Sequence, residues 1–327
     1  MAEVVILTEA GGNVGYGHLM RCRAIADVAG GDLLVQGYGA YPGGDNIQEQ
    51  AWMERTEELT RELPSSCSVL VDSYLATREV YAALSCHFNL VAAIDDYDRL
   101  NYPVNLVINP GLKLPPYRDQ VSTVVGGSEF IILRDAIRHQ APKSNYTRMK
   151  CVLVTFGGSD DRNMLGRLVP LLRDWGLAVI AVVGDDAMRN RLAEAHPDPS
   201  VTWLGRVDAS DIARLMVRSD LALSAGGQTL HELAFLGVPT VGVLTGRDQQ
   251  LNIEGYVAAG FLPARLDAES LDLEAQIVEL IEAYRDPALR RSAGLAGRRI
   301  VDGRGVLRIV ELLQSGFRKF RREEGRQ

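Results

Sequence analysis

The feature that most constrains the fold is a glycine-rich turn directly after a short β-branched run, and it occurs in both halves of the chain. In the first half the run Glu3–Leu7 precedes the glycine-rich stretch Gly11–His18. In the second half Cys151–Thr155 precedes a glycine pair at 157–158. A buried strand followed by a glycine turn and an amphipathic segment opens a strand–helix–strand unit. Each half is therefore predicted to begin a parallel sheet.

Strand-like runs and longer amphipathic segments alternate along the rest of the chain. The further strand-like runs are Asp32–Val35, Ser68–Val71, Leu90–Ile94, Leu106–Ile108, Val179–Val183, Val201–Trp203, Leu221–Ser224 and Thr240–Val243. Helical patterns cover His18–Val28, Thr77–Cys86, Asn163–Trp175, Ala187–His196, Ser210–Arg218, Thr229–Gly237, Gln250–Ala259 and successive segments from Glu269 to about Lys319. The alternation predicts an α/β protein whose sheets are doubly wound, with helices on both faces.

A polar segment from about Ala136 to Lys150 interrupts this alternation and is predicted to link two domains. The length of 327 residues also suits two domains of about 150 residues each. We expect an N-terminal domain over 1–140 and a C-terminal domain over 141–327, with the terminal helices able to return to the first domain. Ligands of doubly wound sheets bind beyond the carboxyl ends of the strands. Two such halves are therefore expected to face a central cleft.

Composition argues against several classes of protein. The formal net charge of −7 disfavours nucleic acid or an anionic membrane as the main partner, because both select basic surfaces. No run of about 18 uncharged apolar residues predicts a transmembrane helix, and the N-terminal residues lack the pattern of a secretory signal. The scattered cysteines are Cys22, Cys67, Cys86 and Cys151. We expect a cytoplasmic protein with reduced thiols, no metal site and no stable membrane insertion.

The first glycine loop carries a histidine at the start of the predicted helix. Gly15 and Gly17 allow the backbone to approach a ligand closely, and a helix N-terminus favours negative charge. His18 would then act as a base beside the ligand. The spacing fits neither a Walker A loop nor a dinucleotide-binding fingerprint. A tight turn with an exposed histidine remains the alternative.

The second glycine loop contains Gly157, Gly158 and Ser159 directly after a strand. Its backbone N–H groups are candidates for binding phosphate. The alternative is a plain strand-to-helix turn in which Ser159 or Asp160 caps the following helix.

A third loop, from Ser224 to Glu232, again joins a strand to a helix through two glycines. Gly226 and Gly227 form the turn, and the N–H groups of Gly227, Gln228 and Thr229 would face a diphosphate at the helix N-terminus. Glu232 lies one turn further along, where a carboxylate suits a diol such as ribose. Compensation of the helix dipole is the alternative role of Glu232.

Three further features are candidates with simpler alternatives. The amides of Gln249 and Gln250 could bind sugar hydroxyls, whereas Asp248 could simply cap a helix. Tyr74, at the end of a strand, could donate a proton or stack on a ring, or be a half-buried aromatic residue. The stretch Asp96–Asp98 superficially fits the DxD pattern of metal-dependent sugar transferases, but a turn or an interdomain hydrogen bond is the preferred interpretation.

Taken together, these stretches resemble the nucleotide-sugar hydrolases of pseudaminic acid biosynthesis and the related spore coat polysaccharide proteins. The matching motifs are Gly15-x-Gly17-His18-x-x-Arg21, Asp72-Ser73-Tyr74, Ile94-Asp95-Asp96, Val107-Ile108-Asn109, Phe130-Ile131-Ile132-Leu133-Arg134, Thr155-Phe156-Gly157-Gly158-Ser159-Asp160, Gly226-Gly227-x-Thr229-x-x-Glu232 and Val301-Asp302-Gly303-x-Gly305. They occur in the family's order from about residue 7 to residue 310.

This resemblance implies the GT-B fold, two Rossmann-like domains around a cleft, and hydrolysis of a UDP-linked diacetamido-trideoxyhexose to UDP and the free sugar. His18 would activate water and Tyr74 would lie beside the sugar. Gly226, Gly227, Gln228 and Glu232 would hold the UDP portion, and no metal or other cofactor would be needed. A GT-B glycosyltransferase with a UDP-sugar donor and a non-catalytic nucleotide-sugar binding protein remain the alternatives.

Overall fold

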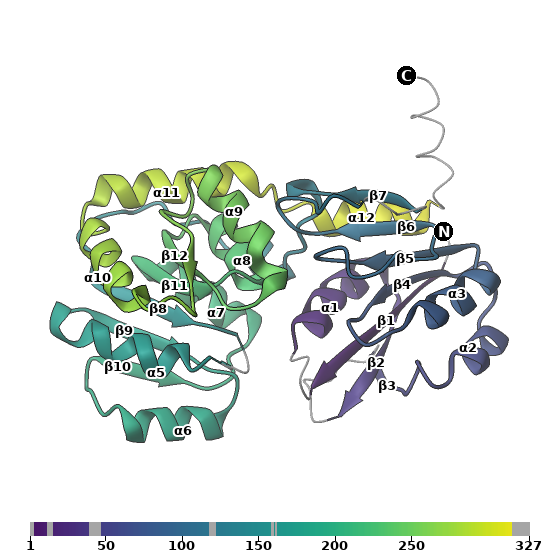
Figure 1. Cartoon of the computed structure of the whole chain (residues 1–327), viewed down its shortest axis with the longest axis horizontal. Coiled ribbons are helices and arrows are strands. Elements are labelled where there is room, and N and C mark those ends of the chain that lie inside the picture. Colours follow the sequence, from purple (N-terminus) through teal and green to yellow (C-terminus); the bar gives the residue numbers. More distant parts are fainter. Residues whose placement is uncertain are drawn as a thin grey trace. The chain divides into compact units, whose positions relative to one another are not determined.

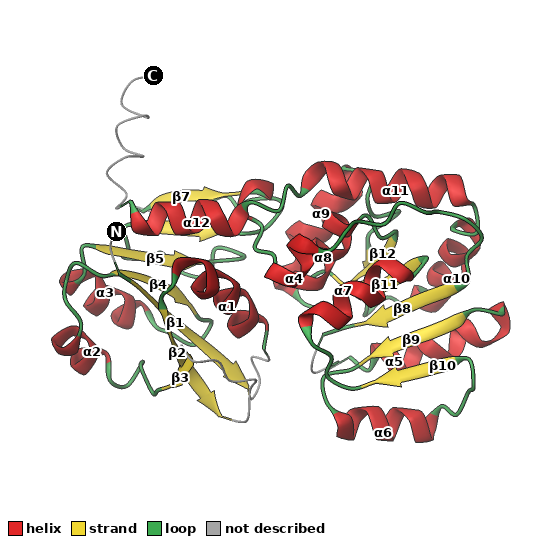
Figure 2. Ribbon diagram, turned by 180° about the vertical axis from the view of Figure 1, so that it is seen from behind, coloured by secondary structure: helices red, strands yellow, loops and turns green. Residues whose placement is uncertain are grey.

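The computed structural model describes residues 3–11, 16–38, 47–117, 122–157, 160 and 162–315. The chain divides into two compact units (Figures 1 and 2). Unit 1 contains the residues up to Arg134 and those from Gly303 onward, and unit 2 contains Asp135–Asp302. The boundary therefore lies a few residues before the expected one, and the described residues from Gly303 to Ser315 belong to unit 1. Within the described part of the chain, no helix is both long and apolar enough to cross a membrane.

In unit 1 the described strands form one parallel sheet in the order β3-β2-β1-β4-β5-β6-β7. Their bounds are β1 Val4–Gly11, β2 Asp32–Tyr38, β3 Ile47–Glu49, β4 Ser68–Asp72, β5 Leu90–Ile94, β6 Leu106–Asn109 and β7 Thr123–Gly126. The chain winds outward in one direction from β1 to β3 and then in the other direction from β4. The reversal between β1 and β4 is the position at which doubly wound sheets bind ligands.

Helices cover both faces of this sheet. One face packs against α1 (Gly17–Ala29) and α12 (Gly305–Gln314), through an apolar core that includes Ile6, Ile25 and Ile309. The other face packs against α2 (Thr56–Glu62) and α3 (Arg78–His87). The alternating side chains of each strand explain the two cores, since neighbouring residues point to opposite faces. A short 3₁₀ turn, η1 (Ser128–Phe130), contacts α12.

Unit 2 repeats this plan. Its described strands form a parallel sheet in the order β10-β9-β8-β11-β12-β13, with the reversal between β8 and β11. The strands are β8 Cys151–Thr155, β9 Ala178–Val182, β10 Val201–Leu204, β11 Leu221–Ala225, β12 Thr240–Leu244 and β13 Leu266–Asp267. The predicted doubly wound, parallel organisation is therefore confirmed in each unit.

The described helices of unit 2 also form two layers. One layer, built around the large apolar core, contains α5 Met164–Leu168, η2 Val169–Trp175, α6 Asp186–Ala195 and α10 Leu273–Ala283. The other face of the sheet contacts α7 Ala209–Arg218, α8 Gln228–Leu236 and α9 Gln250–Ala258. The remaining elements are α4 Asp135–His139, η3 Arg247–Gln249 and α11 Pro287–Ile300, which packs against α8.

Several elements differ from the sequence prediction. The helix predicted over Asn163–Trp175 is one short α-helix followed by 3₁₀ turns, because Pro170 cannot donate a backbone hydrogen bond inside a continuous helix. The predicted polar linker begins with α4, which packs against α7. Its next residues lie along unit 2, where Lys143 N donates to the Leu236 carbonyl at 2.8 Å and the Tyr146 hydroxyl donates to the Gly237 carbonyl at 2.7 Å. Short elements such as β3, α2 and β7 were not predicted, because they contain too few residues to establish a periodic pattern.

Candidate active site

The reversal point of unit 1 brings together side chains from three neighbouring elements. His18 and Arg21 lie in the first turns of α1, which follows β1. Asp72 is the last residue of β4, and Tyr74 follows two residues later. Asp96 comes two residues after the end of β5. Because β1, β4 and β5 are adjacent and parallel, the ends of these elements meet at one edge of the sheet.

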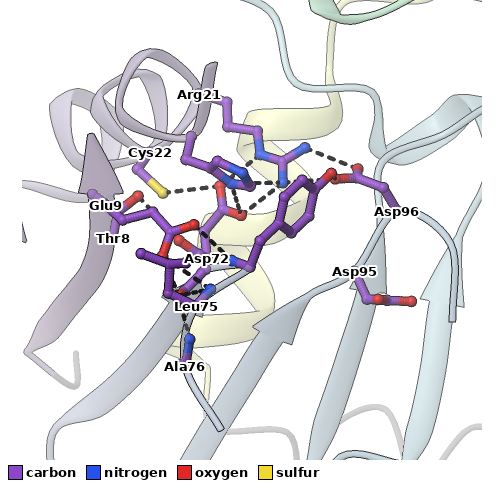
Figure 3. Close-up of polar contacts among 12 residues, drawn as sticks. Thr8, Glu9, Arg21, Cys22, Asp72, Leu75, Ala76, Asp95 and Asp96 are labelled. Atoms are coloured by element: carbon purple, nitrogen blue, oxygen red, sulfur yellow. Dashed lines mark hydrogen bonds and ion pairs between the residues drawn. The ribbon is translucent and has the colours of Figure 1, made fainter. Parts of the chain in front are cut away.

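Arg21 joins the two carboxylates of this site (Figure 3). Its Nε lies 2.5 Å from Oδ2 of Asp72, and its Nη2 lies 2.6 Å from Oδ1. On the other side, Nη1 and Nη2 donate to the two oxygens of Asp96 at 2.8 and 2.9 Å. Both ion pairs are therefore bidentate, which is the strongest and most directional arrangement of a guanidinium and a carboxylate.

His18 is oriented by Asp72. The Nδ1 atom of His18 lies 2.7 Å from Asp72 Oδ1, and both side chains are buried. A carboxylate can only accept a hydrogen bond, so Nδ1 carries the proton in this contact. In the neutral imidazole, Nε2 is then the basic nitrogen, and within the described residues it has no hydrogen-bond partner. This is the arrangement of a histidine positioned to accept a proton.

Burial and ion pairing have opposite effects on the acids of the site. Burial raises the pKa of Asp72, but Arg21 and His18 outweigh it and hold that pKa well below its usual range. Burial likewise raises the pKa of Asp96, while Arg21 and the Tyr74 hydroxyl lower it. With both carboxylates ionised and Arg21 charged, the group carries one negative charge.

Tyr74 is held beside the histidine. Its ring contacts the imidazole of His18 edge to face, with the ring centroids 4.3 Å apart. Its hydroxyl donates a hydrogen bond of 2.6 Å to Asp96 Oδ2. The sequence analysis predicted that the Tyr74 hydroxyl could donate a proton in catalysis. In this structure the hydroxyl donates its hydrogen bond to Asp96 instead. Orientation of His18 is the role that these contacts support.

Glu9 is a further buried acid at this edge, and the sequence reasoning did not select it. It lies near the end of β1 and is fully buried. Its carboxylate accepts hydrogen bonds from the Ser73 hydroxyl, from Tyr74 N at 2.7 Å and from Leu75 N at 3.2 Å. Glu9 therefore fixes the loop that carries Tyr74.

Asp72 and Asp96 were also not assigned roles from the sequence. The available signal was positional, because each follows the carboxyl end of a predicted strand. The neighbouring Asp95 organises the turn instead, since it accepts hydrogen bonds from Asp98 N at 2.7 Å and Arg99 N at 3.0 Å. The DxD-like stretch is thus a turn whose first acid pairs with Arg21. No group of three His, Cys, Asp or Glu side chains in the described residues could hold a metal ion.

In unit 2, the N-terminus of α8 lies at the corresponding reversal point, after β11. Gly227 precedes the helix, and Gln228 and Thr229 form its first turn. Packing requires glycine at position 226, because a Cβ there would lie 2.7 Å from Ile253 Cγ1 and 3.0 Å from Gln249 Cβ. Glu232 is fully buried one turn into the helix. A helix N-terminus that is preceded by glycines can bind an anion.

The two glutamines assigned to sugar hydroxyls make contacts within unit 2. Gln249 Oε1 accepts hydrogen bonds from Gly226 N at 3.0 Å and from Thr245 N at 3.2 Å, so it ties β12 to the turn before α8. Gln250 Nε2 donates to Glu254 Oε1 at 2.9 Å on the surface of α9. Gln249 thus stabilises the turn that forms the candidate anion site.

The second glycine loop has a different arrangement. Gly157 adopts a left-handed backbone with φ of 86°, which favours glycine. Asp160 accepts hydrogen bonds from Met164 N at 2.7 Å and Leu165 N at 3.0 Å. A carboxylate therefore already occupies the start of α5, which agrees with the capping alternative. Gly158 and Ser159, like Gly15 of the first loop, lie outside the described residues.

Comparison with known sequences finds a relative that aligns along nearly the whole chain. No protein-family model matches. The spore coat polysaccharide biosynthesis protein SpsG of Bacillus subtilis is 25% identical in an alignment of 342 positions, gaps included, that covers 95% of this chain and 98% of that protein. The uncharacterized protein MJ1062 of Methanocaldococcus jannaschii is 26% identical over 151 residues, covering 42% of this chain and 31% of that protein.

Comparison with solved structures identifies the fold. The complex of S. aureus MnaA with UDP has a TM-score of 0.62 at 15% identity, covering 96% of both chains. The UDP-GlcNAc 2-epimerase of Neisseria meningitidis bound to UDP-GlcNAc has a TM-score of 0.61 at 15% identity, covering 96% of this chain and all of that one. The spinosyn rhamnosyltransferase SpnG has a TM-score of 0.57 at 13% identity, covering 94% and 99%. The chain thus has the two Rossmann-like domains of the GT-B fold and is similar to SpsG over nearly its whole length.

Proposed function

We propose that this protein hydrolyses a UDP-linked amino- or deoxy-sugar to UDP and the free sugar, in the biosynthesis of a nonulosonic acid or a surface polysaccharide. The observation that carries the proposal is the buried pair of His18 and Asp72, 2.7 Å apart. It leaves Nε2 of the imidazole as the basic atom at the carboxyl edge of the unit 1 sheet.

The proposed reaction needs one base and a good leaving group. Nε2 of His18 takes a proton from water while the water oxygen bonds to the anomeric carbon. The bond from that carbon to the phosphate oxygen breaks, and UDP leaves with the bonding electrons. Asp72 stabilises the imidazolium that forms. The carboxylate pair of ordinary glycosidases is not required, because a nucleoside diphosphate leaves more readily than an alcohol.

The charges at the two candidate sites support a model in which each unit binds a different part of the substrate. Four acids, Glu9, Asp72, Asp95 and Asp96, lie at the carboxyl edge of the unit 1 sheet. Such an edge disfavours a diphosphate and suits a neutral sugar. The proposal therefore assigns the reacting sugar to unit 1 and the diphosphate to the N-terminus of α8 in unit 2.

In unit 2, the backbone of Gly226 and Gly227 and the first turn at Gln228 and Thr229 would hold the phosphates. Glu232 would bind the ribose. The UDP and UDP-GlcNAc in two proteins of this fold support a UDP-linked substrate. The likeness to SpsG, a protein of spore coat polysaccharide biosynthesis, supports the surface polysaccharide context.

The second candidate is glycosyl transfer from a UDP-sugar. The likeness to the rhamnosyltransferase SpnG favours it, because His18 could deprotonate an acceptor hydroxyl as readily as water. The two candidates use the same base and differ only in the acceptor.

The test is incubation of the protein with a panel of UDP- and CMP-sugars in ¹⁸O-labelled water, with and without candidate acceptors. Hydrolysis predicts UDP release without an acceptor and ¹⁸O in the sugar rather than in the phosphate. His18→Ala should lower turnover by about 10²–10⁴-fold and leave UDP affinity nearly unchanged. The matched control is His139→Ala, which removes an exposed histidine at the end of α4 and should keep full turnover.

The other outcomes discriminate among the alternatives. Release that depends on an acceptor would identify a transferase. Interconversion of UDP-sugars without release would indicate an epimerase. Nucleotide-sugar binding with no turnover by the unmodified protein would indicate a binding protein, and failure to bind any nucleotide would overturn the proposal as a whole.

A further inference from the structure

Asp96 lies at the junction of the contacts that hold the histidine. Its side chain is largely buried, with 16% exposed. Both of its oxygens accept hydrogen bonds from Arg21, and one also accepts a hydrogen bond from the Tyr74 hydroxyl. Arg21 and Tyr74 are in turn the side chains that, with Asp72, lie against the imidazole of His18. One carboxylate thus reaches the base by two routes.

The first route passes through the guanidinium of Arg21. A guanidinium is planar and rigid, so the fork that binds Asp96 also fixes the direction of the fork that binds Asp72. Asp72 in turn holds Nδ1 of His18. Without Asp96, the guanidinium of Arg21 would be held by Asp72 alone, and its orientation would be less firmly fixed.

The second route passes through the phenol ring of Tyr74. The 2.6 Å bond to Asp96 fixes the hydroxyl, and the edge-to-face contact then limits rotation of the imidazole. Edge-to-face aromatic pairs are directional. The imidazole is therefore held by the carboxylate at Nδ1 and by the phenol ring at its face.

Asp96 itself is placed by a turn that hydrogen bonds to Asp95 hold together. Its neighbour Asp95 accepts hydrogen bonds from two backbone N–H groups of that turn. Asp95 also accepts from the hydroxyls of Tyr102 at 3.0 Å and Tyr117 at 2.7 Å. The backbone on both sides of Asp96 is thus anchored to the core of unit 1, as positioning of a catalytic group requires.

We infer that Asp96 is a positioning residue for His18, acting through Arg21 and Tyr74 to fix the imidazole with Nε2 as its basic nitrogen. This inference rests on the proposed role of His18 as base. The inference assigns the first acid of the DxD-like stretch to the positioning of His18 on α1, rather than to metal binding.

The test compares Asp96→Asn with the matched control Asp98→Asn. Both changes remove one negative charge from the same loop. Asp98 is exposed and has a left-handed backbone with φ of 62°, a conformation that asparagine tolerates well. The control therefore isolates the contacts of Asp96 from a general change in charge.

The first readout is the ¹⁵N NMR spectrum of His18 in the intact protein, assigned with His18→Ala, over a range of pH. The charged groups facing His18 are Arg21 from α1, Asp72 from β4 and Asp96 beyond β5. In Asp96→Asn the contacts that orient the imidazole are broken, so the Nδ1–H tautomer should lose its dominance. Asp98→Asn should leave the tautomer of His18 unchanged.

The second readout is turnover. In Asp96→Asn the plateau of kcat should fall by about 10- to 100-fold, because the base is no longer fixed. Tyr74→Phe breaks only the second route and keeps the ring, so it should lower kcat by less than Asp96→Asn does. That variant also serves if Asp96→Asn does not fold.

An unchanged tautomer of His18 in Asp96→Asn would overturn the inference, and so would equal effects of Asp96→Asn and Asp98→Asn. If Asp96→Asn does not fold, an unchanged kcat in Tyr74→Phe would overturn it. The NMR readout does not require turnover. Altered His18 signals without hydrolysis of any UDP-sugar would support Asp96 as the positioning residue and reject the proposed reaction.

Discussion

At the scale of single residues, Asp72 is the acceptor on which the unit 1 site depends. It is fully buried and accepts hydrogen bonds from His18 Nδ1, from Arg21 through Nε and Nη2, and from Cys22 Sγ at 3.4 Å. These donors keep the carboxylate ionised despite its burial, which alone would raise its pKa. The ionised state is what allows Asp72 to stabilise a protonated histidine.

The lowered pKa of Asp72 predicts how stability depends on pH. Asp72→Asn should lower the free energy of unfolding by about 2–3 kcal/mol at pH 7, less than the roughly 3–5 kcal/mol typical of breaking a buried ion pair, because Asp96 still pairs with Arg21. A group with a depressed folded-state pKa contributes its full stability above the unfolded-state pKa of about 3.9. That contribution is lost as pH falls toward the folded-state pKa.

The measurement is urea unfolding of both proteins between pH 7 and pH 2.5. The difference between wild type and Asp72→Asn should be constant down to about pH 4.5 and shrink below it. Asp98→Asn, which changes an exposed acid, should follow the wild type throughout. A difference that stays constant to pH 2.5 would show that Asp72 is not held ionised by its neighbours.

At the scale of elements, the candidate anion site of unit 2 depends on close packing of the turn before α8 against α9. Ile253 and Gln249 come from α9 and the turn before it, and they leave no room for a side chain at position 226. The same Gln249 accepts a hydrogen bond from Gly226 N. The position of the turn before α8 is therefore set by the neighbouring helix.

Two adjacent glycines provide a matched test of this packing. In Gly226→Ala the new Cβ would lie 2.7 Å from Ile253, so α9 must move and the Gln249 contact weakens. We expect a loss of about 1–3 kcal/mol of stability and an increase of about tenfold in the Kd for UDP. In Gly227→Ala the nearest atom is Gln249 Nε2 at 4.0 Å, so stability should hardly change.

Thermal unfolding and titration calorimetry with UDP measure the two effects. Equal loss of stability in both variants would contradict the packing argument. A stable Gly226→Ala protein with unchanged UDP affinity would place the UDP site away from the start of α8.

At the scale of the whole molecule, the last helix completes the first unit. Residues from Gly303 onward belong to unit 1 although they follow all of unit 2 in the sequence. The apolar face of α12 is buried in the unit 1 core at Val306, Ile309 and Leu313. The Ser68 hydroxyl of β4 also donates to the Leu313 carbonyl at 2.7 Å. Unit 1 is thus built from both ends of the chain.

A chain that stops at Asp302 should therefore lose unit 1 and keep unit 2. Each buried apolar side chain of α12 contributes roughly 1.5–3 kcal/mol, so their sum is comparable to the ~5–15 kcal/mol net stability of a domain. Calorimetry should show loss of one unfolding transition and retention of the other. The retained unit should still bind UDP, while hydrolysis disappears.

Point substitutions in α12 give the graded control. Ile309→Ala removes a fully buried side chain and should lower the free energy of unfolding by about 2–5 kcal/mol. Leu307→Ala removes a side chain that is 44% exposed, so the loss of stability should be much smaller. Both substitutions should act on the same calorimetric transition. An unchanged transition in Ile309→Ala would mean that α12 does not contribute to unit 1.

The sequence by itself determined the local structure and the places where ligands could bind. Strands, helices and glycine turns follow from hydrophobic period and backbone freedom, which are properties of neighbouring residues. The repeated strand-to-helix rhythm also determined two parallel sheets, and it located His18 and Gly226–Gly227 at the carboxyl ends of strands. These features need no information about which distant segments pair.

Only the tertiary structure decided which side chains meet. His18 and Asp72 are 54 positions apart, and Arg21 and Asp96 are 75 apart. They come together because β4 lies between β1 and β5, an order set by burial of apolar faces over the whole sheet rather than by any local pattern. The same long-range burial returned α12 to unit 1. It also decided that Asp160 caps α5 and that Gln249 supports Gly226, because each of these contacts depends on where a packed neighbour leaves a polar group.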